Sequence, residues 1–153
     1  MDNAAQLKMS SELADSIRQH GAEAYPHECC GALLGRDTEV ADRRVYREIH
    51  AVHPLINRRE DSPQNRFSVT SQDVLEAEKD ARDRGLEVVG WYHSHPDHPA
   101  CPSQYDRDHA WPWYSYIIVS VANKVPEEMT SWRLADDRTD FECEEIGLQQ
   151  AAF

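Results

Sequence analysis

The sequence predicts a mixed α/β fold in which helices flank one β-sheet. Three short apolar stretches, 29–35, 86–95 and 113–121, have the composition of buried strands. Two other stretches, 10–24 and 72–84, repeat their apolar residues every three or four positions, as amphipathic helices do. Because a helix does not follow every strand, the pattern favours a mixed sheet over a regularly wound parallel one.

Length and composition limit the classes of protein and partner. A chain of 153 residues suits one domain with a buried core, so we treat 1–153 as a single domain. The net charge of −12 argues against nucleic acid or an anionic membrane as partner, because the field of the protein repels phosphate. No apolar run approaches the roughly 18–20 residues of a membrane span. The first residues do not resemble a secretory signal, so we expect a cytoplasmic protein.

The first predicted helix begins at Ser10 or Ser11, either of which can cap it. Its apolar stripe consists of Leu13, Ala14, Ile17, Gly21 and Ala24. Pro26 ends this helix, and the small apolar residues of 29–35 then predict a buried strand. We expect a turn at 36–38.

The next stretch, 40–52, predicts one or two further strands. His50 and His53 are three positions apart, so on a strand they face opposite sides, and we expect both to be structural or surface residues. A polar loop over 54–66 precedes a short strand at 67–69. Long loops in compact domains are often functional.

The second predicted helix spans 72–84, with Ser71 as its cap and Gly85 just beyond its end. The residues expected to face the core are Val74, Leu75, Ala77 and Ala81. Towards the C-terminus, 113–121 is the longest apolar run and predicts a central strand. Strands at 131–134 and 141–146, joined by a turn, are expected towards a sheet edge.

The segment 90–106 gathers candidate metal ligands. His93 and His95 lie one residue apart at the end of an apolar strand, so their side chains share a face. The flanking run is too apolar for a strand on which both histidines are solvated. A loop then leads to Ser103 and Asp106 at a helix start. Imidazole and carboxylate suit zinc, and a catalytic zinc uses three protein ligands and one water.

Ser103 and Asp106 also have the spacing of a capping box, in which each bonds to the backbone of the other. Both interpretations can hold together, since a capped first turn would keep the carboxylate in place for a metal. From the residues alone, Glu28 is equally well a solvated loop acid or a functional group at the start of a buried strand.

The four cysteines do not predict a disulfide framework in a chain of this length. Cys29 and Cys30 are adjacent, outside any Cys-x-x-Cys spacing, so a cysteine zinc site is not expected. Cys101 lies in the loop that follows the histidines. A small loop filler is the favoured interpretation, and a functional or vulnerable thiol is the alternative.

The sequence HSHP at 93–96, the S-x-x-D at 103–106, and Glu28 within Pro-His-Glu-Cys-Cys-Gly together closely resemble the JAMM (MPN+) zinc metalloproteases. The resemblance extends over about 25–145, and no motif position departs from it. It implies an MPN, or JAB1-like, fold. That fold has a curved mixed sheet and a three-layer arrangement similar to that of cytidine deaminases.

The resemblance also implies roles for single residues. His93, His95 and Asp106 would hold one catalytic Zn²⁺. Glu28 would be the general base, and Ser103 would donate a hydrogen bond to the developing oxyanion. The implied reaction is hydrolysis of the amide bond that follows the C-terminal Gly-Gly tail of a ubiquitin-like protein.

This compact chain resembles the stand-alone prokaryotic form of the family. For that form, the implied partner is a ubiquitin-like sulfur carrier, from which the enzyme would release cysteine or trim C-terminal residues. The sequence does not decide between a monomer and a homodimer. The alternative function is a non-catalytic MPN scaffold that binds partner proteins. A zinc deaminase is disfavoured, because it would need a Pro-Cys-x-x-Cys pair that is absent here.

Overall fold

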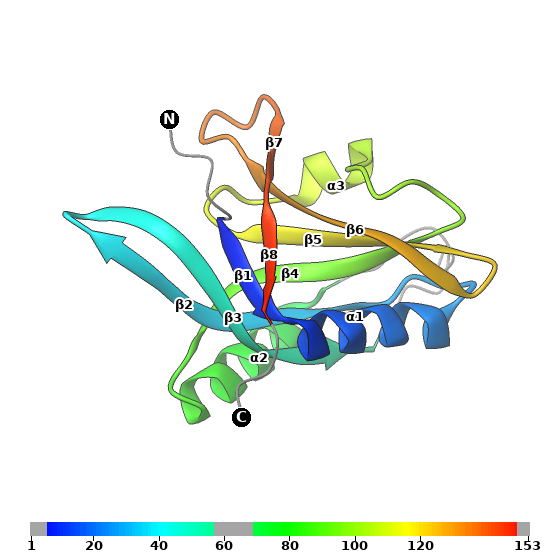
Figure 1. Cartoon of the computed structure of the whole chain (residues 1–153), viewed down its shortest axis with the longest axis horizontal. Coiled ribbons are helices and arrows are strands. Elements are labelled where there is room, and N and C mark those ends of the chain that lie inside the picture. Colours follow the sequence, from blue (N-terminus) through cyan, green and yellow to red (C-terminus); the bar gives the residue numbers. More distant parts are fainter. Residues whose placement is uncertain (1–5, 57–68, 150–153) are drawn as a thin grey trace.

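The computed structural model of the chain describes residues 6–56 and 69–149. Within these ranges, one eight-stranded sheet carries three helices (Figure 1). In chain order the elements are β1 (Leu7–Ser10), α1 (Ser11–Ala24), β2 (Cys30–Val40), β3 (Arg43–Leu55), α2 (Ser71–Asp83), β4 (Glu87–Pro96), α3 (Gln104–His109), β5 (Ser115–Ala122), β6 (Val125–Leu134), β7 (Phe141–Glu144) and β8 (Ile146–Gln149). No helix in this part of the chain is both long and apolar enough to span a bilayer.

The sheet is mixed, as predicted, and its strand order is β7-β6-β5-β4-β2-β3-β1-β8. Strands β4 and β5 are parallel, as are β1 with β3 and β1 with β8, and the other neighbours are antiparallel. Only Glu145 separates β7 from β8, although they form opposite edges of this order. The two edges must therefore meet, which is why the sheet curls almost into a barrel (Figure 1).

Each face of the sheet has its own hydrophobic cluster. Helix α1 buries Ala14 and Ile17 in the cluster that contains Leu33. Helix α2 buries Ala77 and Ala81 in the cluster that contains Leu34. Leu33 and Leu34 are consecutive residues of β2, and successive side chains of a strand point to opposite faces. Helix, sheet and helix thus form the three layers that the resemblance implied.

The cap of α1 was predicted correctly, and the cap of α2 was predicted wrongly. Ser10 caps α1, with its hydroxyl accepting from the Leu13 N–H at 3.1 Å. In α2 the cap is Thr70 and not Ser71. The Thr70 hydroxyl accepts from the Asp73 N–H, and the Asp73 carboxylate accepts from the Thr70 N–H. The reciprocal carboxylate at this spacing decides where the helix starts.

Other boundaries also differ from the expectation. The predicted turn at 36–38 is wrong, because β2 continues to Val40 and the chain reverses at Ala41 and Asp42, both with positive φ. Leu75 was expected in the core but is 60% exposed, because the buried face of α2 runs through Asp73, Ala77 and Ala81 instead.

Strand β1 was not predicted. It has only four residues, and just Leu7 and Met9 are buried in it. The predicted strand 141–146 is divided, since β7 and β8 lie at opposite edges of the sheet.

Near the centre of the sheet the predictions hold more closely. Strand β5 starts at Ser115, two residues later than expected, and Trp113 has a φ of 87°. Strand β6 starts earlier than expected, at Val125. The first two residues of the predicted loop 54–66 belong to β3, and most of the others lie outside the described residues. Of the predicted strand at 67–69, only Val69 is described, and it is not in a strand.

A buried arginine connects the long β2–β3 hairpin to the middle of the sheet. Arg47 is fully buried and pairs with both carboxylate oxygens of Asp37, at 2.7 and 3.0 Å. It also donates to the carbonyls of Val89 and Trp113 and to the hydroxyl of Ser115. Its guanidinium lies 4.4 Å from the centroid of the Trp113 ring. One side chain therefore ties β3 to β2, β4 and the start of β5.

We predict that Asp37→Ala lowers the free energy of unfolding by about 3–5 kcal/mol, because it leaves a buried cation without its counter-charge. Urea unfolding followed by circular dichroism measures this loss. Glu39→Ala, at an exposed position on the same strand, is the control and should change stability by less than about 0.5 kcal/mol. Equal effects of the two substitutions would contradict the role of the ion pair.

Candidate metal centre

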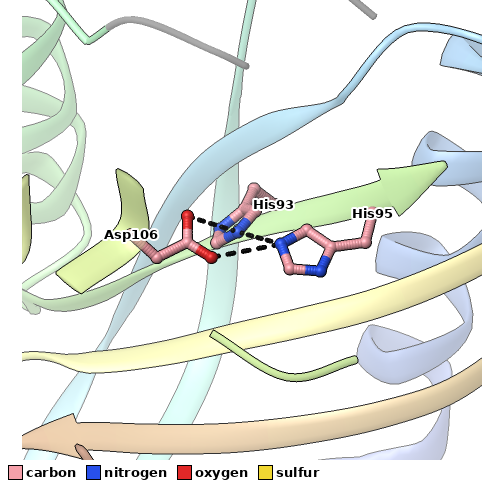
Figure 2. A group of neighbouring side chains, drawn as sticks. All are labelled: His93, His95 and Asp106. Carbon is pink, nitrogen blue, oxygen red and sulfur yellow. Dashed lines mark hydrogen bonds and ion pairs between the residues drawn. The ribbon is translucent and has the colours of Figure 1, made fainter. Parts of the chain in front are cut away.

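The two histidines lie near the end of β4, between two neighbouring strands. His93 is paired with Cys30 of β2 on one side and with Ile118 of β5 on the other. His95 follows two residues later, opposite Ser120 of β5. Both are buried, and both side chains project from the same face of the strand, as the spacing predicted (Figure 2). The central position of β4 therefore fixes the backbone that carries them.

The three predicted ligands come together. The Nε2 atoms of His93 and His95 are 3.1 Å apart. Oδ1 of Asp106 lies 3.2 Å from His93 Nε2, and Oδ2 lies 3.1 Å from His95 Nε2 (Figure 2). Ligands about 2.0–2.1 Å from a tetrahedral ion are separated by about 3.3 Å. The separations of these donor atoms therefore fit three ligands of one zinc ion.

A capping box holds Asp106 beside the histidines. The Ser103 hydroxyl accepts from the Asp106 N–H at 3.1 Å, and Oδ2 of Asp106 accepts from the Ser103 N–H at 2.9 Å. Burial on its own would raise the pKa of Asp106, but His93, His95 and the Ser103 N–H outweigh burial and hold this pKa well below its usual range. The carboxylate is therefore ionised, as a metal ligand must be.

The orientation of His95 follows from a backbone contact. Its Nδ1 lies 2.8 Å from the carbonyl oxygen of Pro99. A carbonyl only accepts, so Nδ1 carries a proton, and Nε2, which lies 3.1 Å from Oδ2 of Asp106, is the ring nitrogen left to face the cluster and bind a metal. Burial acts to lower the pKa of His95, but the Asp106 carboxylate and the Pro99 carbonyl outweigh burial and raise it.

Glu28 lies near the cluster but outside it. Only 5% of this residue is exposed, although it sits in the loop before β2. It lines a cleft of about 580 Å³ together with His95, Cys101 and Ser103. The three grouped ligand residues do not include Glu28. The structure thus brings all five predicted site residues to one place, with the glutamate separate from the ligand triangle.

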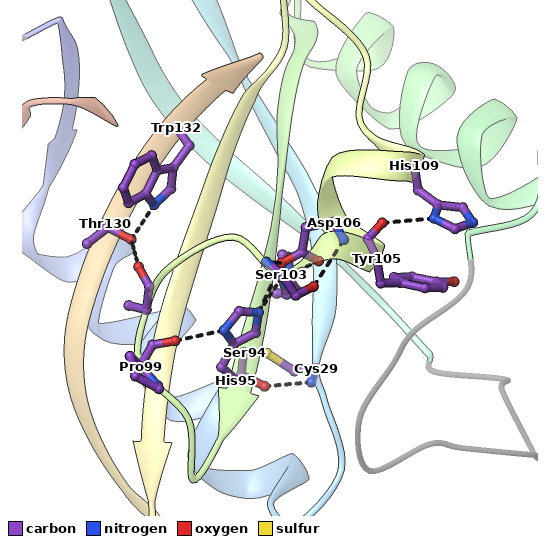
Figure 3. A network of polar contacts seen from close by, with 12 residues as sticks. Cys29, Ser94, His95, Pro99, Ser103, Tyr105, Asp106, His109, Thr130 and Trp132 are labelled. Carbon is purple, nitrogen blue, oxygen red and sulfur yellow. Dashed lines mark hydrogen bonds and ion pairs between the residues drawn. The ribbon is translucent and has the colours of Figure 1, made fainter. Parts of the chain in front are cut away.

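Ser94, which the sequence analysis passed over, positions the segment next to Glu28. Its hydroxyl accepts from the Cys29 N–H at 2.8 Å, and its own N–H donates to the Cys29 carbonyl at 3.2 Å (Figure 3). Ser94 is fully buried on the face of β4 opposite the histidines. A small polar residue at a buried strand position was the signal that could have identified it.

The cysteines give no sign of a metal or disulfide role. None of the four, all within the described ranges, forms a disulfide. Burial raises the pKa of the Cys29 thiol to about 12, so this thiol is not ionised at neutral pH. Cys101 is exposed and lines the cleft. Its two interpretations, a small loop filler or a functional thiol, both stay predictions.

An aromatic pocket of about 490 Å³ adjoins the cleft. Its aromatic lining comes from Trp91, Tyr105, Trp111, Tyr114 and Tyr116. Tyr105 also lines the cleft that contains Glu28, so the two cavities are neighbours. His109 stacks on the Tyr105 ring and lines this pocket.

The family to which the chain belongs follows from a comparison with known protein families. A model of the prokaryotic homologues of the JAB domain matches residues 10–135. The chain belongs to this family. The implied JAB1/MPN fold is therefore confirmed.

Several named proteins are similar to this JAB domain. A desampylase from Haloferax volcanii is 31% identical over 121 residues, which cover 76% of this chain and 81% of that protein. The deubiquitinase BRCC36 from Camponotus floridanus is 38% identical over 95 residues, which cover 58% of this chain and 34% of the relative. Tail tip assembly protein K from Escherichia phage N15 is 28% identical over 145 residues, 95% of this chain and 49% of the phage protein.

Solved structures show the same fold. A protein from Salinibacter ruber has a TM-score of 0.72 at 43% identity, with 93% of this chain and 91% of that chain covered. A JAB1/MPN domain protein from Archaeoglobus fulgidus has a TM-score of 0.57 at 19% identity, with 94% and 99% covered. The second likeness concerns the fold alone.

For this JAB domain we predict that Ser94→Ala lowers the free energy of unfolding by about 1–3 kcal/mol, because the buried Cys29 N–H loses its acceptor. Denaturant unfolding of the metal-free protein measures the effect. Ser16→Ala removes an exposed hydroxyl from α1 and should change stability by less than about 0.5 kcal/mol. A Ser94 variant as stable as the wild type would mean that the hydroxyl does not hold the Glu28 segment.

Proposed function

We propose that this chain is a cytoplasmic zinc metallopeptidase or isopeptidase that hydrolyses the amide bond after the C-terminal Gly-Gly tail of a ubiquitin-like protein. The observation that carries the proposal is the ligand triangle of His93, His95 and Asp106 beside the buried Glu28. Relatives named desampylase and deubiquitinase support removal of a ubiquitin-like protein from its conjugates.

The donor set fits zinc, since two neutral imidazoles and one carboxylate leave an open position. Zinc bound there would supply Lewis acidity, which lowers the pKa of water and polarises the scissile carbonyl. Glu28, buried but outside the ligand triangle, takes the proton of the attacking water and passes it to the leaving nitrogen.

Ser103 is the proposed donor to the oxygen on which negative charge develops. Its hydroxyl already accepts from the Asp106 N–H, so its own proton remains to be donated into the cleft. One such donor contributes about 3 kcal/mol to transition-state stabilisation in other hydrolases. The capping box that fixes Asp106 therefore also fixes the position of this donor.

The partner we propose is a ubiquitin-like sulfur carrier. A Gly-Gly tail has no side chains, so it can lie in a narrow cleft and pair through its main chain. The neighbouring aromatic pocket offers a place for an apolar side chain from the residues before the two glycines. All the proposed groups come from one chain, so the site does not need a second copy of the chain to be complete.

The proposed roles predict different defects for two variants. Glu28→Gln should keep stoichiometric zinc but lose turnover by about 10²–10⁴-fold, since it removes the base and no ligand. His95→Ala should lose zinc. Metal analysis of the purified proteins and a cleavage assay measure these effects, and His50→Ala, an exposed histidine of β3, is the control.

Loss of zinc from Glu28→Gln would show that the glutamate is a ligand. Full zinc occupancy in His95→Ala would remove the proposed centre. If the wild type purifies without stoichiometric zinc, the non-catalytic scaffold becomes the better interpretation.

The substrate class is tested with carrier proteins from the same genome. A carrier that ends in Gly-Gly plus one added residue should lose that residue in the presence of the wild type, and intact mass spectrometry detects the change. The same carrier with Gly-Gly replaced by Ala-Ala is the matched control, and it should be cleaved far more slowly because its methyl groups widen the tail. Equal rates for both carriers would contradict a groove selective for glycine.

A further inference from the structure

The loop between β4 and α3 carries the carbonyl that orients His95, although it has no regular secondary structure. Its start is anchored at Asp97, whose N–H donates to Val121 and whose carboxylate accepts from the N–H of Asn123 and the hydroxyl of Tyr25. Its end is anchored by the capping box at Ser103. The Pro99 carbonyl lies between these anchors, so its position depends on what holds the middle of the loop.

A side chain from β6 reaches the middle of the loop. The hydroxyl of Thr130 contacts the carbonyl of Ala100, the residue after Pro99, at 2.6 Å (Figure 3). Ala100 is fully buried, so this carbonyl lies in a segment shielded from solvent. Thr130 pairs with Ile118 of β5. Ile118 in turn pairs with His93, so the sheet relates Thr130 to the strand of the ligands.

A second side chain fixes the direction of this hydrogen bond. The indole Nε1 of Trp132 lies 2.8 Å from the Thr130 hydroxyl oxygen. An indole N–H only donates, so the Thr130 oxygen must accept from it, and its own proton is left to point at the Ala100 carbonyl. The contacts thus run in one direction from Trp132 to Thr130 to Ala100. Chains of this kind are more rigid than single hydrogen bonds.

We propose that Thr130, oriented by Trp132, is a positioning residue for the metal centre. By holding Ala100, it fixes the adjacent Pro99 carbonyl, which keeps a proton of His95 on Nδ1 and leaves Nε2 facing Asp106 as the nitrogen that can bind the metal. The inference rests on the proposed zinc site, but it concerns residues outside the ligand set and the catalytic cleft. Hydrogen-bond partners of ligating histidines tune metal affinity in this way.

Zinc affinity of the full chain, measured by competition with a chromophoric chelator, tests the proposal without an activity assay. Thr130→Val keeps the shape of the side chain but removes the hydroxyl, and we expect zinc to bind about tenfold more weakly. Thr130→Ser should restore most of the affinity. Thr38→Val makes the same change on β2, in the distant half of the β2–β3 hairpin, and should leave the affinity unchanged.

Two further measurements separate positioning from stability. In the wild type, the Nδ1 proton of His95 should give a slowly exchanging NMR signal, and in Thr130→Val this signal should broaden through exchange with water. Unfolding of the metal-free variants shows whether Thr130→Val folds. If it does not fold, Trp132→Phe decides, with an expected loss of affinity of about threefold because the hydroxyl proton is no longer directed.

Zinc affinity of a folded Thr130→Val within twofold of the wild type would overturn the positioning role and leave the proposed function intact. Equal losses of zinc affinity in Thr130→Val and Thr38→Val would overturn it as well, because any loss of a threonine hydroxyl from a strand would then have the same effect. A wild type that binds no zinc would remove the proposed function, and this inference with it.

Discussion

The contact between one carboxylate and two imidazoles is the constraint on which the rest of the site depends. Three polar groups are brought out of water within about one hydrogen-bond length of one another, which an apolar core would not tolerate without mutual compensation. Each group compensates for the burial of the others because the fold holds the three at a fixed distance. His93 and His95 are carried by a central strand, and Asp106 is locked by its own helix cap. The strand and the helix cap therefore set the positions of the three ligand residues, and these positions do not depend on a long, flexible side chain.

Much of this arrangement was readable from the sequence, because it rests on local rules. The alternation of a strand puts His93 and His95 on one face, and the capping spacing puts Asp106 at a helix start. The mixed sheet with flanking helices follows from apolar periodicity in the same way, whereas the three-layer arrangement was implied by the family resemblance. Glu28 could not be assigned from local rules, since a loop acid has no periodic signature. Only the family resemblance linked it to the histidines, and in the folded chain it lines the same cleft as His95.

What the sequence did not predict depends on partners far along the chain. Ser94 became significant only when the fold brought Cys29 beside it, and Thr130 only when the fold brought Ala100 within hydrogen-bond distance of it. The division of 141–146 into two edge strands reflects closure of the sheet, which no short window can reveal. The exposure of Leu75 is similar, because the choice of buried face on α2 is made by the sheet beneath it. These features are decided by tertiary contacts and not by propensity.

The buried guanidinium of Arg47 has a consequence for engineering. This guanidinium pairs with Asp37 and donates to the Trp113 carbonyl, and Trp113 directly precedes Tyr114, which lines the aromatic pocket. A hairpin transplanted from another family member with a different residue at position 47 would leave the Ser115 hydroxyl and the Trp113 ring without the guanidinium that contacts them here. Chimaeras should therefore exchange the β2–β3 hairpin together with the segment that carries Trp113 and Ser115.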